Sequence, residues 1–118
     1  MTITFVVKGE PRPKQSFRYT KNGGGFTSAR VKEWQETVAW ESKIAMKGKD
    51  LLEGSFYITL NFRLGNKRRV DLDNLSKCVL DAMNGIVYKD DTEVVKLNLH
   101  KTVSDDVGVS VYVSILKT

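Results

Sequence analysis

A chain of 118 residues, 41% of them hydrophobic, can build a core of its own, and we expect residues 1–118 to form one domain. A single cysteine and a single histidine exclude an intramolecular disulfide and a Cys/His zinc cluster. The net charge of +5 favours an anionic partner such as nucleic acid, and the short apolar runs without a basic leader predict a cytoplasmic protein with no membrane span.

The N-terminal region reads as a strand followed by a basic loop. Ile3, Phe5 and Val7 alternate with their neighbours until glycine and proline end the pattern. The next stretch, residues 11–26, carries cations such as Lys14 and Arg18 with aromatic residues between them. This mixture suits phosphate contact and base stacking, although a solvated loop without a role is the plain alternative.

Apolar residues then recur at helical spacing and predict a helix over about residues 29–46, with Thr27 or Ser28 as its cap. Trp34 falls on the apolar stripe, so we interpret it as a core residue. Trp40 lies off the stripe and is not assigned. Residues 56–64 alternate between apolar and polar side chains and predict the clearest strand of the chain.

A second, short helix is predicted over residues 72–83, where Asn84 and Gly85 supply the stop. Two alternating segments, residues 95–100 and 109–115, flank a turn at residues 104–108 and are interpreted as a C-terminal hairpin. The order β-α-β-α-β-β predicts an α+β fold, a mixed α/β arrangement in which helices pack on a mixed sheet.

The feature that suggests chemistry is a pair of aspartates, Asp71 and Asp73, directly after the cations Lys67, Arg68 and Arg69. Residues two apart share one face only in extended chain, so convergence on one cation requires Asp71 to precede the helix. Asp73 would then lie at the helix start, with Lys77 one turn later on the same side. Mg²⁺ prefers such carboxylate oxygens, which makes a metal site the functional interpretation.

Asp90 and Asp91 precede the predicted strand at residue 94, and the fold can return one of them to the first pair. Plain structural interpretations stand beside the metal site. Asp73 can cap the helix or pair with Lys77, and Asp90-Asp91 can be a turn. Cys78 is expected to be a buried thiol and His100 a solvent-facing strand residue.

Three segments together resemble the RusA-type Holliday-junction resolvases. They are G-E-P-R-P-K at residues 9–14, R-R-V-D-L-D-N-L-S-K at 68–77 and Y-K-D-D-T-E-V-V at 88–95. The resemblance implies a homodimeric, bacterial or phage-encoded endonuclease that binds four-way DNA junctions and makes paired nicks with Mg²⁺ or Mn²⁺.

Carried over residue by residue, the resemblance makes Asp71, Asp73 and Asp91 metal-binding catalytic acids and Lys77 a catalytic lysine, for which we favour electrostatic stabilisation. It leaves Asp90 unassigned. A DNA-binding role is expected for a set of cations: Lys14, Arg18, Lys67, Arg68 and Arg69.

Two other functions remain open at this point. One is a less selective branched-DNA or flap nuclease with the same metal site, because junction selectivity depends on dimer shape. The other is a non-catalytic basic nucleic-acid-binding module. Carboxylates inside a phosphate-binding surface repel the ligand unless a cation intervenes, so the aspartates favour metal-assisted cleavage over plain binding.

Overall fold

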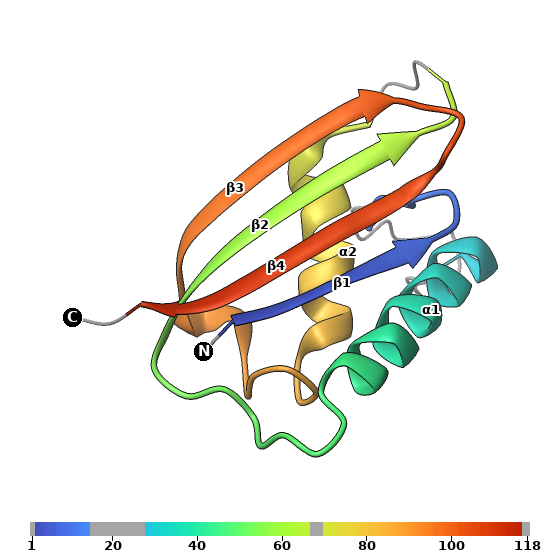
Figure 1. Cartoon of the computed structure of the whole chain (residues 1–118). Helices are drawn as coiled ribbons and strands as arrows, with labels where there is room; N and C mark the ends of the chain where they lie inside the picture. The colour runs from blue at the N-terminus through green and yellow to red at the C-terminus, as the bar shows by residue number, and fades with distance from the viewer. Residues whose placement is uncertain (1, 15–27, 67–69, 117–118) are drawn as a thin grey trace, which may run out of the picture.

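A computed structural model of the chain describes residues 2–14, 28–66 and 70–116. The elements in chain order are β1 (Thr2–Lys8), α1 (Ala29–Ala45), β2 (Ser55–Leu64), α2 (Leu72–Met83), the 3₁₀ helix η1 (Asp91–Glu93), β3 (Val94–Val103) and β4 (Gly108–Leu116). Apart from η1, this is the predicted β-α-β-α-β-β order, and the α+β class is confirmed (Figure 1).

The four strands form one mixed sheet in the order β1-β4-β2-β3. β4 pairs antiparallel with both β1 and β2, whereas β2 and β3 run parallel. Two parallel neighbours need a crossover connection, and α2 provides it. The predicted mixed sheet is therefore confirmed, and α2 is the helix of a β-α-β unit.

The predicted C-terminal hairpin is wrong, because β2 lies between β3 and β4 (Figure 1). Burial explains this order. Alternate residues of β2 are almost fully buried, as a central strand requires. β3 is mostly exposed and takes the edge. The connection crosses the end of β2, where Ser104 N donates to Leu64 O at 2.8 Å and Arg63 Nε donates to Asp106 O at 2.8 Å.

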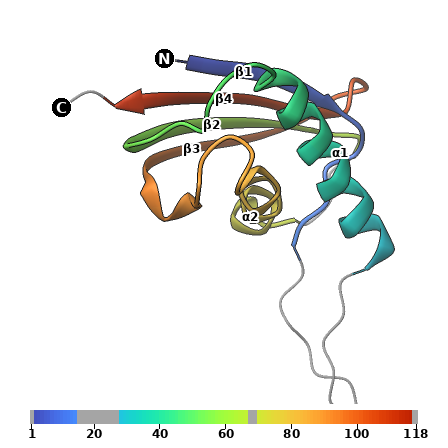
Figure 2. The same ribbon diagram turned by 90° about the horizontal axis from the view of Figure 1, so that it is seen from below.

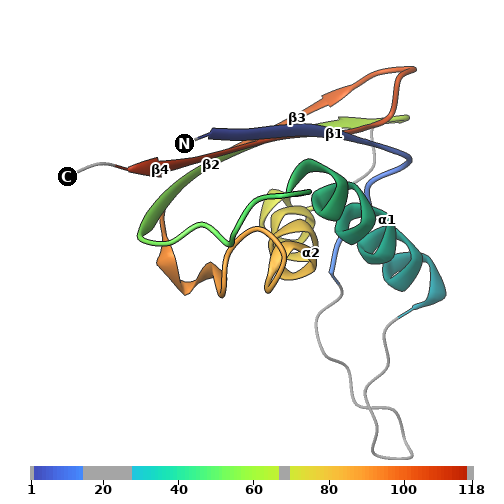
Figure 3. The same ribbon diagram turned by 60° about the horizontal axis from the view of Figure 1, so that its bottom comes forward.

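Both helices cover the same face of the sheet, so the molecule has two layers (Figures 2 and 3). The helix α1 begins after Ser28, whose Oγ accepts from Val31 N, and it ends one residue before the predicted limit of 46. Trp34 is a core residue, as predicted, with 5% of its surface exposed, whereas Trp40 is 64% exposed. Neither helix is long and apolar enough to cross a membrane, among the residues described.

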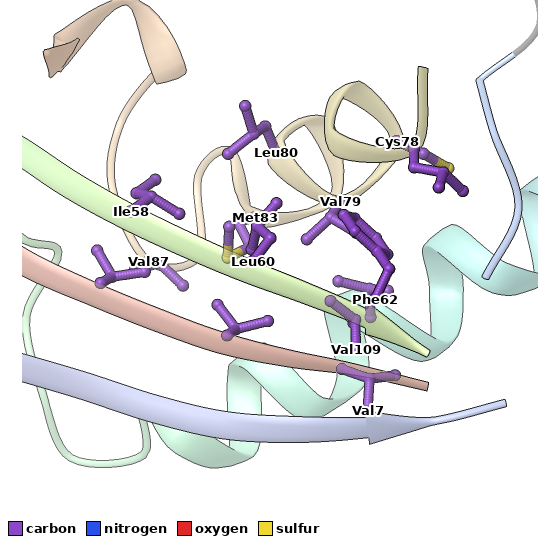
Figure 4. Packing of buried hydrophobic residues seen from close by; sticks show 14 of the residues in the cluster. Val7, Ile58, Leu60, Phe62, Cys78, Val79, Leu80, Met83, Val87 and Val109 are labelled. Carbon is purple, nitrogen blue, oxygen red and sulfur yellow. The ribbon is translucent and has the colours of Figure 1, made fainter. Parts of the chain in front are cut away.

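The core lies between β2 and α2. Figure 4 shows Ile58, Leu60 and Phe62 of the sheet against Val79 and Met83 of the helix, all of them buried. This packing holds α2 at a fixed position over the parallel strands. The position of α2 in turn sets the positions of the predicted site residues at its two ends.

The chain after α2 is anchored by Tyr88, a fully buried residue. Its ring stacks on Phe56 of β2 at 5.5 Å between centroids, and its hydroxyl donates to Leu80 O of α2 at 3.0 Å. Burial, and then the charges of Asp91 and Asp81, raise the pKa of Tyr88 far above its ordinary value. These contacts of Tyr88 fix the segment that leads to Asp91 against the C-terminal part of α2.

Candidate active site

The start of α2 has the geometry that convergence on a cation requires. Asp71 is the N-cap residue with extended backbone (φ −73°, ψ 133°), and Asp73 lies in the first turn. Both side chains are exposed, and the Asp71 carboxylate makes no capping hydrogen bond. The expectation that Asp71 precedes the helix is confirmed, and the alternative in which Asp73 caps the helix is wrong.

Lys77 lies one turn after Asp73 on the exposed part of α2. Residues four apart are neighbours on a helix surface, so the ammonium group can reach the same region as the Asp73 carboxylate. Both residues are described, and they form no ion pair with each other. The interpretation of Asp73 and Lys77 as an ordinary structural salt bridge is therefore wrong, and both groups face solvent.

The chain just before α2 is tied to the edge of the sheet by Lys101 of β3. Its Nζ donates to Val70 O at 2.7 Å. This contact fixes the residue that immediately precedes Asp71, so the approach to the candidate site is held by the parallel strand next to β2. The sequence analysis did not single out Lys101, because a lysine in an edge strand reads as a solvated side chain.

Asp91 lies at the other end of α2, where it begins η1 and is partly buried. Burial, a hydrogen bond with Asp90, and the charges of Asp81 and Asp90 raise the pKa of Asp91 above its ordinary value. Asp81 lies in the last turn of α2. The carboxylate that the structure brings close to the Asp90–Asp91 pair is thus Asp81, which the sequence analysis did not name.

The predicted acids Asp71, Asp73 and Asp91 are not gathered into one preformed cluster. Within residues 2–14, 28–66 and 70–116, no group of three or more His, Cys, Asp or Glu side chains stands ready to hold a metal ion. Asp73 and Asp81 are eight residues apart, about 12 Å along the helix axis. Two acidic positions therefore lie on α2, one at each end, with Lys77 between them.

The predicted DNA-contacting cations fall into two groups. Arg18, Lys67, Arg68 and Arg69 lie outside the described residues. Lys14 is described, and its Nζ is ion-paired with the Asp81 carboxylate. The sequence could have pointed to Asp81, since it continues the four-residue spacing of Asp73 and Lys77 along α2 and these are the charged residues of that helix.

The single thiol and the single histidine take no part in this site. Cys78 is fully buried in α2, and burial raises the pKa of its thiol to about 12, so the expectation of a buried, unreactive cysteine is confirmed. His100 is exposed on β3, as predicted. The candidate chemistry therefore depends on carboxylates and lysines.

Comparison with known proteins identifies the chain as an endodeoxyribonuclease, a hydrolase that cleaves the phosphodiester bonds of DNA. It belongs to the endodeoxyribonuclease RusA family, whose model matches residues 8–114. A crossover junction endodeoxyribonuclease RusA from Aquifex aeolicus (strain VF5) is 30% identical over 92 residues, which cover 75% of this chain and 71% of that protein. The predicted family is confirmed.

Proposed function

We propose that this endonuclease resolves four-way DNA junctions by paired, symmetric nicks in a Mg²⁺-dependent reaction. Membership of the RusA family supports the substrate and the reaction. The observation that carries the proposal is the pair of exposed carboxylates, Asp71 and Asp73, where the chain enters α2 directly after three cations. Carboxylates in that position repel DNA unless a cation lies between them and the phosphate.

Asp71, Asp73 and Asp91 would hold the metal ion, with Mn²⁺ as a substitute for Mg²⁺. The donor set fits, because Mg²⁺ takes one or two carboxylates and completes its shell with waters and substrate phosphate oxygens. A site of this kind need not be closed before DNA binds, which agrees with the separation of Asp91 from the helix start. When bound, the ion supplies an activated water and polarises the scissile phosphate.

The basic residues would act on the DNA itself. Lys77, exposed between the acidic positions, would stabilise the negative charge that develops on the phosphate during cleavage. A second group would neutralise backbone phosphates and make binding fall with salt, namely Arg18, Lys67, Arg68 and Arg69. Lys14 differs from these cations, since its charge is already paired with Asp81.

Resolution needs two cuts on opposed strands, and a two-fold homodimer would supply two matched sites. The edge strand β3 supports such pairing. Its outer backbone faces no other strand of the sheet, and Val95, Leu97 and Val103 are exposed along it by 59, 37 and 54%. An edge strand with exposed apolar side chains is suited to association with a second strand. We further propose that residues 1–118 act as one domain in the cytoplasm of a bacterial cell, whether host- or phage-encoded.

A supercoiled plasmid that extrudes a cruciform distinguishes paired from independent cuts. With Mg²⁺ and limiting protein, we expect linear product to appear directly, because both strands are cut within one binding event. Accumulation of nicked circles before any linear form would contradict paired cleavage and favour a less selective branched-DNA nuclease. A plasmid without the inverted repeat is the control and should remain supercoiled.

A further inference from the structure

Lys14 ends the described part of the basic loop, residues 11–14, and it is fixed to α2 at two points. Its backbone N–H donates to Asn74 O at 2.9 Å, and its Nζ donates to the Asp81 carboxylate. These partners are seven residues apart, roughly 10 Å along the helix axis, so Lys14 contacts both the first and the last part of α2. Cys78 lies between them, on the flank of α2 that this segment follows (Figure 4).

The pair is shielded from solvent on the side of Asp81. The Asp81 side chain is 23% exposed and that of Lys14 is 41% exposed. A carboxylate in contact with an ammonium group offsets its positive charge, so the attraction of that group to a phosphate is weaker. Lys14 is therefore poorly placed to be the DNA contact that its neighbourhood in the sequence predicts.

The segment before Lys14 is stiff, so the contacts of Lys14 with α2 fix the direction of the whole segment. Pro11 and Pro13 each restrict the backbone dihedral φ. Upstream, Gly9 N donates to Val107 O at 3.3 Å, so the segment leaves the sheet at a fixed place. With both ends held, residues 9–14 form a strut from the end of β1 to the flank of α2, beside the face that carries Asp73 and Lys77.

We propose that Asp81 is a positioning residue for junction binding: through its ion pair with Lys14 it holds this strut against α2, beside the exposed face that carries Asp73 and Lys77. The inference rests on the junction cleavage proposed above. Asp81 acts on DNA only through Lys14, so neutralising either partner releases the same segment. The ion pair orders the strut and does not contact phosphate. Its loss therefore lowers the affinity for the junction without changing the number of counterions that are released on binding.

The test compares Asp81→Asn, Lys14→Met and the exchanged pair Lys14→Asp/Asp81→Lys for binding to a synthetic four-way junction in Ca²⁺. Each single variant should weaken binding by the same factor, between about 2- and 5-fold, as a partly exposed ion pair allows. The slope of log K against log salt should stay unchanged, and the exchanged pair should regain most of the affinity. Asp50→Asn, an exposed carboxylate after α1, is the matched control and should bind like the parent.

Two results would overturn the inference. If Lys14 touches phosphate, Lys14→Met lowers the salt slope by about one and Asp81→Asn tightens binding. If Asp81 serves the metal directly, Asp81→Asn lowers the single-turnover cleavage rate at saturating protein by more than about 100-fold, while Lys14→Met leaves that rate intact.

Hydrogen exchange separates failure of this inference from failure of the proposed function. In the free protein, the amide of Lys14 should exchange at least about threefold faster in Asp81→Asn than in the parent, because its bond to Asn74 O opens more often. This readout needs no DNA. If the parent protein does not bind or cleave junctions, the proposed function fails, but hydrogen exchange still tests the role of the Lys14–Asp81 ion pair. If exchange at Lys14 is unchanged in Asp81→Asn, the inference is wrong whatever the protein cleaves.

Discussion

Asp73→Asn is expected to reduce junction cleavage more than about 100-fold if Asp73 holds the metal ion as we propose, because loss of a ligand exceeds the 10- to 100-fold effect typical of groups that only support ligands. The carboxylate is exposed in the first turn of α2 and forms no ion pair with Lys77, so its replacement by an isosteric amide leaves the fold unchanged. Single-turnover cleavage of a labelled junction in Mg²⁺ measures the effect.

Junction binding should persist in Asp73→Asn, since removal of a negative charge does not weaken attraction to phosphate. Asp105→Asn, an exposed carboxylate in the turn before β4, is the control and should cleave like the parent. Cleavage by Asp73→Asn within threefold of the parent would remove this residue from the site.

Phe56→Ala should lower the free energy of unfolding by about 3–5 kcal/mol, the usual cost of truncating a large buried aromatic residue. Phe56 is 1% exposed, and its ring supports Tyr88, which anchors the segment leading to Asp91. The substitution therefore leaves a cavity where β2 meets that segment. Urea unfolding followed by circular dichroism measures the change.

Val6→Thr is the matched control for that experiment, because Val6 is 50% exposed on β1 and the exchange conserves shape. A change within about 0.5 kcal/mol is expected there. If Phe56→Ala cost less than 1 kcal/mol, the stacked Phe56–Tyr88 pair would not be part of the core.

The elements could be predicted from local pattern, since burial on one face imposes its period on the sequence. The alternation of β2 and the spacing of α2 are examples, and Gly85, with φ 77°, follows the helix where the stop was expected. The position of Asp71 just before α2 also followed from geometry, because only extended chain lets carboxylates two residues apart share a face.

Strand neighbours and long-range ion pairs could not be predicted in this way. The alternation of β3 and β4 identifies strands but not their partners, and the insertion of β2 between them depends on how deeply each strand is buried. The pairing of Lys14 with Asp81 joins residues 67 positions apart. This ion pair depends on the packing of the segment after β1 beside α2, which local sequence pattern does not specify.

The most direct measurement is cleavage of a labelled four-way junction and a matched linear duplex by the purified protein, each with Mg²⁺ or EDTA. We expect symmetric nicks in the junction with Mg²⁺, no cleavage with EDTA and little cleavage of the duplex. Junction binding without cleavage in Mg²⁺ or Mn²⁺ would contradict the account and leave a DNA-binding protein without the proposed metal site.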